Sequence, residues 1–246
     1  MRIAVIGGTG LVGREVVRVL EQRGDEPVVV ARSRGIDVST GEGLDEALAG
    51  VDAVIDVTNA PARTKDEARA FFGAATENLL QAEQRAGVGH HVVLSIVGVE
   101  RAPSNAHYAG KRLQEKLSLE GPIPATIVRA TQFHDFGAQV AGWTRDGDTA
   151  TIPPLLVQPI AVADVAAILA EVASQPGRDE VIEIAGPERQ DLVDMTRRTL
   201  AKRGEQLKLV ASFGGAFTTE MAGEALLPGP DTRIAPTTFE DWLAAA

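Results

Sequence analysis

Glycines recur every three residues in a short segment near the start of the chain. The apolar run Ile3 to Ile6 comes directly before this segment, and Val16, Val19 and Leu20 continue after it at helical spacing. The segment therefore joins a predicted strand to a predicted helix. It consists of Gly7, Gly8, Thr9, Gly10, Leu11, Val12 and Gly13.

A glycine turn between a strand and a helix presents backbone N–H groups and the positive helix end to an anion. Gly7 would permit the tight turn, Gly10 would let a phosphate approach the backbone, and Gly13 would let the helix pack on the strand. The first two of these glycines stand one residue further apart than in the GxGxxG fingerprint. We expect Gly7, Thr9, Gly10, Leu11, Val12 and Gly13 to bind the pyrophosphate of a dinucleotide; a glycine-rich structural turn is the alternative.

Two arginines follow the second predicted strand, Val28 to Ala31, where NAD-binding proteins carry an acidic residue for the ribose 2′-hydroxyl. A carboxylate would repel a 2′-phosphate, whereas a guanidinium binds it through charge-assisted hydrogen bonds. Arg32 and the adjacent Ser33 are thus expected to favour NADP(H) over NAD(H). Arg34 is the weaker candidate and could be a solvated loop charge.

Other residues follow predicted strands at what should be the same sheet edge. Asp37 and Val38 come after a short extended piece, and Thr58, Asn59 and Ala60 end the strand Ala53 to Val57. Ligands of open α/β sheets bind outside the carboxyl ends of the strands. These residues are therefore expected to flank the adenine and its ribose.

Apolar strands alternate with helical patterns along the chain, which predicts a doubly wound parallel sheet of Rossmann type, covered on both faces. The long helices are expected at about Thr64 to Ala86 and Asn105 to Leu119. Beyond about Asp148 the alternation weakens, so residues 148–246 are expected to form a small substrate-side lobe of a single 1–246 domain. Further strands are predicted at Val92 to Val97, Thr126 to Arg129 and Val181 to Ile184.

The composition excludes several classes of partner. A formal net charge of -10 opposes binding to a phosphate backbone, so no nucleic-acid partner is expected. The absence of cysteine excludes disulfides and thiolate ligands and fits a reducing compartment. We expect a soluble, cytoplasmic protein without a membrane partner, because polar residues interrupt the apolar stretch Leu155 to Ala173.

Four segments together resemble the atypical short-chain dehydrogenase/reductase superfamily, in particular its NmrA-like, NAD(P)-binding branch. They are GGTGLVG from Gly7, LSIVGVE from Leu94, YAGKRLQEKL from Tyr108 and VRATQFHDF from Val128. The superfamily uses a Ser, a Tyr and a Lys four residues after the Tyr. The resemblance places Ser95 at the Ser position and Lys111 at the Lys position, and it implies that both residues also contact the cofactor.

The Tyr position of that triad falls on His107, whereas Tyr108 lies one residue further along the predicted helix. His107 shares a helix face with Lys111 and could donate a proton, or it could be a helix residue without a chemical role. By resemblance, Ala130, Thr131 and Phe133 would pass the nicotinamide, although Phe133 could be core. Arg129 could form an internal salt bridge, and Asp164 is expected to cap a helix N-terminus.

Three functions fit this pattern. The first is an NADP(H)-dependent oxidoreductase acting on a small carbonyl or quinone-like substrate. The second is a non-catalytic NAD(P)-binding sensor or regulator that acts through a protein partner, a role favoured by the missing Tyr. The third, a sugar-nucleotide epimerase or dehydratase, would usually need a larger C-terminal domain. His90, His91 and His134 show no metal-ligand spacing, so no metal site is predicted. The pattern leaves the oligomeric state open.

Overall fold

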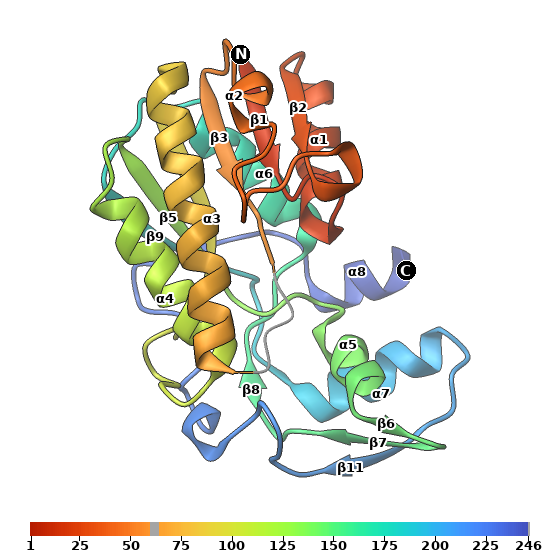
Figure 1. Ribbon diagram of the computed structural model, residues 1–246. Coiled ribbons are helices and arrows are strands. Elements are labelled where there is room, and N and C mark those ends of the chain that lie inside the picture. The colour runs from red at the N-terminus through yellow and green to blue at the C-terminus, as the bar shows by residue number, and fades with distance from the viewer. Residues whose placement is uncertain (60–63, 246) are drawn as a thin grey trace. The chain divides into compact units, whose positions relative to one another are not determined.

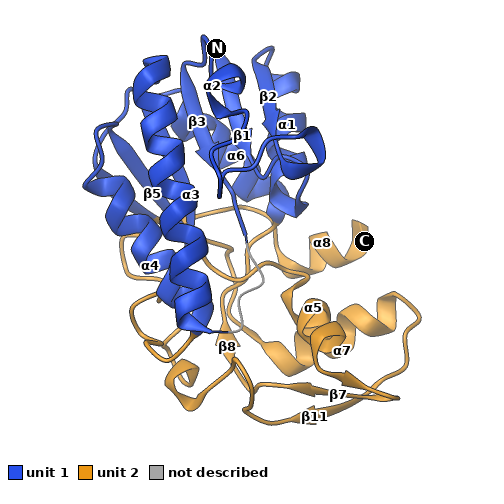
Figure 2. Ribbon diagram, in the orientation of Figure 1, with its two compact units in different colours: residues 1–96, 106–129, 162–182 blue, residues 97–105, 130–161, 183–246 orange. Residues whose placement is uncertain are grey.

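A computed structural model of the chain describes residues 1–59 and 64–245. Two compact units make up the structure, and both are discontinuous in sequence (Figure 2). Unit 1 comprises Met1–Ile96, Ala106–Arg129 and Val162–Ile182, and unit 2 comprises Val97–Asn105, Ala130–Ala161 and Glu183–Ala246. The chain returns to unit 1 at Val162, inside the range that the sequence analysis assigned to the lobe. The prediction of one domain with a lobe from about residue 148 stays a prediction.

Unit 1 is built on parallel strands (Figure 1). Its strands are β1 (Arg2–Ile6), β2 (Glu26–Val30), β3 (Ala53–Asp56), β4 (His90–Ile96) and most of β5 (Ala125–Ala130). Its helices are α1 (Leu11–Gln22), the short η1 (Arg32–Arg34), α2 (Leu44–Ala47), α3 (Lys65–Ala86), α4 (Ala106–Leu119) and α6 (Val162–Ala173). Helices α1 and α6 pack together, as do α3 and α4.

The central sheet has seven strands in the order β12-β9-β5-β4-β3-β1-β2, with β9 at Glu180–Ala185 and β12 at Arg233–Ile234. From β1 the chain first moves outward to β2 and then returns to the other side of β1 as β3. This reversal is a topological switch point, where doubly wound sheets form their ligand crevice. The predicted Rossmann-type α/β fold is confirmed, and each of the six predicted strands is found within a few residues of its expected bounds.

Local signals explain where the helices of unit 1 begin and end. The Thr64 side chain accepts a hydrogen bond from the backbone N–H of Glu67, and the Glu67 side chain accepts one from the backbone of Thr64, which together form a capping box. This capping box begins α3, and the helix ends at its C-cap Gly87, whose φ of 74° belongs to the left-handed region that favours glycine. The predicted cap at Asp164 is wrong, because α6 begins at Val162. Asp164 lies in its first turn, where a carboxylate complements the helix dipole.

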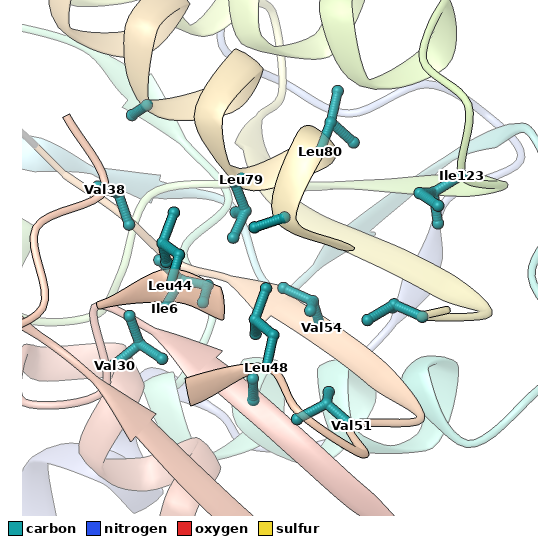
Figure 3. Packing of buried hydrophobic residues seen from close by; sticks show 14 residues of the cluster. Ile6, Val30, Val38, Leu44, Leu48, Val51, Val54, Leu79, Leu80 and Ile123 are labelled. Atoms are coloured by element: carbon teal, nitrogen blue, oxygen red, sulfur yellow. The ribbon is translucent and has the colours of Figure 1, made fainter. Parts of the chain in front are cut away.

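A buried aliphatic cluster fills the space between the sheet and helices α2 and α3 (Figure 3). Ile6 and Val54 contribute from the strands, Leu44 and Leu48 come from the α2 segment, and Leu79 comes from α3. Because branched aliphatic side chains on adjacent strands pack closely against a helix, the cluster fixes α3 on this face of the sheet.

Unit 2 contains the ends of β5 and β9, the strand β12 and a set of shorter elements for which no bounds were predicted. The shorter elements are α5 (Phe136–Trp143), β6 (Arg145–Asp146), β7 (Thr149–Ile152), β8 (Leu156–Val157), β10 (Gln190–Asp191), α7 (Leu192–Lys202), β11 (Lys208–Ala211), η2 (Thr219–Met221) and α8 (Phe239–Ala245). Strands of two to four residues carry too few alternating side chains to be recognised by periodicity. Among the helices that the structure describes, none combines the length and apolar character needed to cross a bilayer.

Candidate nucleotide-binding site

The glycine segment forms a tight turn that leads from β1 into α1. Gly7 adopts a φ of 80° and donates its N–H to the carbonyl of Val30 at 2.9 Å, and Gly10 donates to the carbonyl of Gly7 at 2.9 Å. Gly10 is the N-cap of α1 and, as a glycine, has no side chain that could cap the helix, and the first turn of α1 carries no acidic residue. The first N–H groups of a helix have no acceptor within the helix, so this end can receive an anion.

Close backbone packing explains why glycine stands at several of these positions. A Cβ on Gly13 would overlap the Gly7 carbonyl oxygen and lie 2.6 Å from the Cα of Gly8. A Cβ on Gly8 would lie 2.9 Å from the carbonyl oxygen of Val5. The turn is therefore pressed against the start of α1, which holds its amides close to one another.

Strand register brings the other predicted cofactor residues to the same edge. Ile6 is paired with Val30 on one side and with Asp56 on the other, and Asp56 is paired with Val93 on β4. The residues that follow these strand ends therefore emerge together. A Cβ on Gly7 would lie 3.1 Å from the carbonyl of Val57, which places the turn directly beside the end of β3.

Arg32 and Ser33 lie exposed in η1, immediately beyond the end of β2. Within residues 1–59 and 64–245, no ion pair of Arg32 is recorded, so its guanidinium can bind an added anion. Asp37 is its acidic neighbour, and the Asp37 carboxylate accepts hydrogen bonds from the N–H and hydroxyl of Ser39 at 2.9 and 2.7 Å. These bonds, together with the charge of Arg32, hold the pKa of Asp37 below its ordinary value.

The expected adenine-side residues have different environments. Val38 is a member of the aliphatic cluster, so its side chain contributes to the core. The Thr58 backbone N–H binds the carboxylate of Asp56 at 2.8 Å, and Asn59 is exposed at the end of the described segment. Ala60 lies outside the described residues. Contacts from Asp37, Val38, Thr58, Asn59 and Ala60 to an adenosine stay predictions.

Lys111 is deeply buried on α4, with 3% of its surface exposed. Its ammonium donates to the carbonyl of Leu94 at 2.6 Å and to the side-chain oxygen of Gln114, and it lies 5.1 Å from the centre of the Phe72 ring. Burial lowers the pKa of Lys111 to about 8, although the charges of Asp56 and Glu115 oppose this shift. Lys111 is therefore a polar group held inside unit 1, beside the strand that carries Ser95.

Ser95 and His107 complete the set of residues that the resemblance assigned to chemistry. Ser95 is 3% exposed, and its hydroxyl has no hydrogen-bond partner among the described residues. His107 packs edge-on against Phe72 at 5.6 Å, and burial, together with the charge of Lys111, lowers its pKa to about 4. The His107 imidazole is therefore neutral near pH 7. Burial also raises the pKa of Tyr108, which disfavours its ionisation.

The sequence analysis did not identify two buried residues near Lys111. Gln114 contacts Lys111 directly, and Asp56 is joined to it through Gln114. Gln114 bonds to Lys111 through its oxygen and donates its amide N–H to Asp56 at 2.7 Å. Asp56 is 1% exposed at the carboxyl end of β3. The available signals were an acidic residue ending an apolar strand and a glutamine three residues after the lysine.

Other buried polar groups of unit 1 form structural pairs. The predicted internal salt bridge of Arg129 is confirmed, because its guanidinium binds the Glu115 carboxylate at 2.6 Å. His91 Nδ1 lies 2.7 Å from Glu83, and both side chains are fully buried. Burial lowers the pKa of His91, but the adjacent Glu83 carboxylate raises it, and the resulting pKa lies above its ordinary value. His90 Nε2 lies 3.0 Å from the Thr126 hydroxyl.

The residues expected near the nicotinamide belong to unit 2. Thr131 donates its hydroxyl hydrogen to the carbonyl of Gln158 at 2.6 Å, and its backbone N–H bonds to Ile184. Phe133 is half-buried and forms a bridge with Ile160. Ala130 is the last residue of β5. Cofactor contacts from Ala130, Thr131 and Phe133 stay predictions.

The glycine turn and α1 match a known sequence family. A family model described as NAD(P)H-binding matches residues 7–176. The chain belongs to this NAD(P)H-binding family. The match begins at the first glycine of the turn and includes Arg32, Asp56, Ser95 and Lys111, and it confirms the expected nicotinamide-nucleotide cofactor in its general form. The NAD(P)-binding part of the resemblance is thereby confirmed.

Relatives and solved structures agree with this family. A (4-alkanoyl-5-oxo-2,5-dihydrofuran-3-yl)methyl phosphate reductase from Streptomyces griseus is 34% identical over 65% of this chain and 62% of its own length. A photosystem II assembly factor from Synechocystis is 30% identical over 54% of this chain and 45% of its own length. The chain thus spans about half to three fifths of these relatives. A short-chain dehydrogenase/reductase superfamily structure with bound NAD from Agrobacterium tumefaciens has a similar fold, with a TM-score of 0.73, 18% identity, and coverage of 100% of this chain and 95% of its own.

Replacing Gly13 with alanine should destabilise the protein, because the added methyl group would overlap the backbone of Gly7 and Gly8. We expect a loss of roughly 1–3 kcal/mol in the free energy of unfolding, measured by urea titration. Gly142→Ala in α5 is the control, because a Cβ there meets no atom within 4 Å in the described part of the chain. Equal stability of the two variants would contradict the packing argument.

The buried ammonium of Lys111 should make stability depend on pH. In the unfolded chain the lysine keeps its proton up to about its ordinary pKa of 10.5, whereas in the folded protein it releases the proton near pH 8. Between these values the unfolded state binds more protons, so the free energy of unfolding should rise with pH. Denaturant titrations at pH 7.5 and 9.5 should show a larger rise for the natural protein than for Lys111→Met. Identical pH dependence would refute the buried-ammonium assignment.

Proposed function

We propose that the protein is an NADP(H)-dependent oxidoreductase that transfers a hydride to or from a small carbonyl or quinone-like substrate. The observation that carries this proposal is the meeting, at one edge of a parallel sheet, of an uncapped glycine-rich helix N-terminus and the exposed guanidinium of Arg32. The name of the Streptomyces griseus relative, a reductase, supports hydride transfer. The substrate is a small molecule, and neither nucleic acid nor a membrane is required.

The preference for the phosphorylated cofactor follows from charge at the end of β2. The residues directly after this strand include Arg32 and no carboxylate, so a 2′-phosphate would meet a cation. A guanidinium can form two parallel hydrogen bonds to such a phosphate. The Asp37 carboxylate is engaged by Ser39, which leaves Arg32 available for the cofactor.

The residues of this chain also fit a bound nicotinamide ribose. The Ser95 hydroxyl is buried without a partner in the described residues, and Lys111 has three N–H donors, of which Leu94 and Gln114 use two. A bound nicotinamide would supply or accept the hydride. Lys111 would hold the ribose, and Ser95 would donate a hydrogen bond to the substrate oxygen. Neutral His107 could orient that oxygen, while water supplies the proton.

The second candidate function is a non-catalytic NAD(P)-binding sensor or regulator that acts through a protein partner. It is favoured by the replacement of the superfamily's Tyr with His107, because the low pKa of His107 leaves almost no protonated imidazolium to donate a proton at neutral pH. The Synechocystis relative, which is named as an assembly factor, supports this alternative.

Arg32→Ala should remove the preference for NADPH. Loss of charge-assisted hydrogen bonds to a phosphate corresponds to about 1.5–3 kcal/mol, or roughly a tenfold to hundredfold weaker Kd for NADPH, with little effect on NADH. Isothermal titration calorimetry with both nucleotides measures this. Arg34→Ala is the matched control from the same short helix and should keep the preference. Equal affinities for the two nucleotides in the natural protein would refute the assignment.

Enzymatic activity is tested by following NADPH oxidation at 340 nm with quinones, aldehydes and ketones as acceptors. We expect turnover with at least one class and a decrease in kcat/KM of about tenfold or more for Lys111→Met, because the ribose loses a hydrogen bond to a charged group. His107→Ala should lower kcat less, because a neutral imidazole only orients the substrate. Tight NADPH binding without turnover of any acceptor would leave the sensor as the better proposal.

A further inference from the structure

Gln114 occupies an unusual place for a glutamine, fully buried at 0% exposure on the inner face of α4. It lies three residues after Lys111, so both side chains point to the same side of the helix. Its oxygen accepts from the Lys111 ammonium, and its amide N–H donates to Asp56 at 2.7 Å. A continuous chain of hydrogen bonds thus joins an ammonium, an amide and a carboxylate inside unit 1.

The polarity of this chain is fixed by its two ends. An ammonium has only donors and a carboxylate only acceptors, so the amide must turn its oxygen to Lys111 and its NH₂ to Asp56. The Asp56 carboxylate is itself held by the backbone N–H of Thr58 at 2.8 Å. The position of Lys111 is therefore tied to the end of β3, next to the glycine turn.

A buried ammonium without partners would be costly and would adopt several positions. Here the Leu94 carbonyl and Gln114 occupy two of its three N–H donors and fix the direction of the third. Aliphatic side chains at positions 56, 111 and 114 together would fill the same space and leave none of these side-chain polar groups to satisfy. Packing alone therefore does not explain why these three buried side chains are polar.

We propose that Gln114 and Asp56 are positioning residues that hold the Lys111 ammonium for a hydroxyl of the nicotinamide ribose. This inference rests on the proposed binding of NADP(H). Gln114 acts through Lys111 and does not touch the cofactor, and Asp56 fixes the Gln114 amide. Together they couple the lysine on α4 to the sheet edge where the pyrophosphate would bind.

The test compares two ligands that differ at the nicotinamide ribose. NADPH contains this ribose, whereas adenosine 2′,5′-bisphosphate lacks it but retains the 2′-phosphate. Gln114→Met, which is similar in volume but cannot form the bridge, should weaken NADPH binding by about tenfold and leave the bisphosphate Kd within about twofold. Ser118→Ala is the matched control, because it removes another buried polar group one turn further along α4 and should change neither Kd.

Two further variants keep the inference testable if Gln114→Met folds poorly. Asp56→Asn should weaken NADPH binding selectively, because an amide cannot accept from both Gln114 and Thr58 as strongly as a carboxylate. Adding Gln114→Met to Lys111→Met should cause no additional loss, because both act through the same contact. Unchanged NADPH binding, or equal weakening of both ligands, in a folded Gln114 or Asp56 variant would overturn the inference. Failure of the natural protein to bind either ligand would instead overturn the proposed function.

Discussion

The close contact between the glycine turn and the start of α1 is the constraint on which the rest of the site depends. The backbone at Gly13 packs against Gly7 and Gly8 with no room for a Cβ, so the helix begins directly above the end of β1. This contact directs the unpaired amides of the first helical turn outward at the switch point of the sheet. In the proposed site, every other candidate residue of unit 1 must lie at the correct distance from these amides, where the pyrophosphate would bind.

Parallel register then determines which side chains share this edge. Ile6 is paired with both Val30 and Asp56, so the segments that leave β2 and β3 flank the glycine turn. The segment after β2 carries the cation Arg32, and β3 ends at Asp56. The exposed Arg32 therefore lies on the surface next to the turn, whereas the buried Asp56 carboxylate is compensated by hydrogen bonds. An exposed cation can exchange its water for phosphate, whereas the buried carboxylate is committed to Gln114 and Thr58.

Burial changes the chemistry available to the residues of α4. Desolvation lowers the pKa values of both Lys111 and His107, but it has different consequences for the two. The lysine remains mostly protonated at pH 7 and is held by a carbonyl and an amide, so it can bind a ribose. The histidine is neutral and packs on an aromatic ring, so it is better suited to orientation than to proton donation. In the proposed function, α4 therefore supplies a residue that binds the cofactor, Lys111, whereas His107 is not its proton donor.

The sequence by itself determined the parallel Rossmann-type sheet, the glycine turn, and the placement of Arg32 after the second strand, because these follow from local periodicity and spacing. The salt bridge of Arg129 was expected only as one alternative, and the cap at Asp164 was predicted wrongly, because helix boundaries depend on packing beyond the first turn. Only the tertiary structure brought Asp56, Gln114 and Lys111 together. Asp56 and Gln114 are separated by 58 positions in sequence, and no local pattern specifies which buried polar groups become partners across a sheet and a helix.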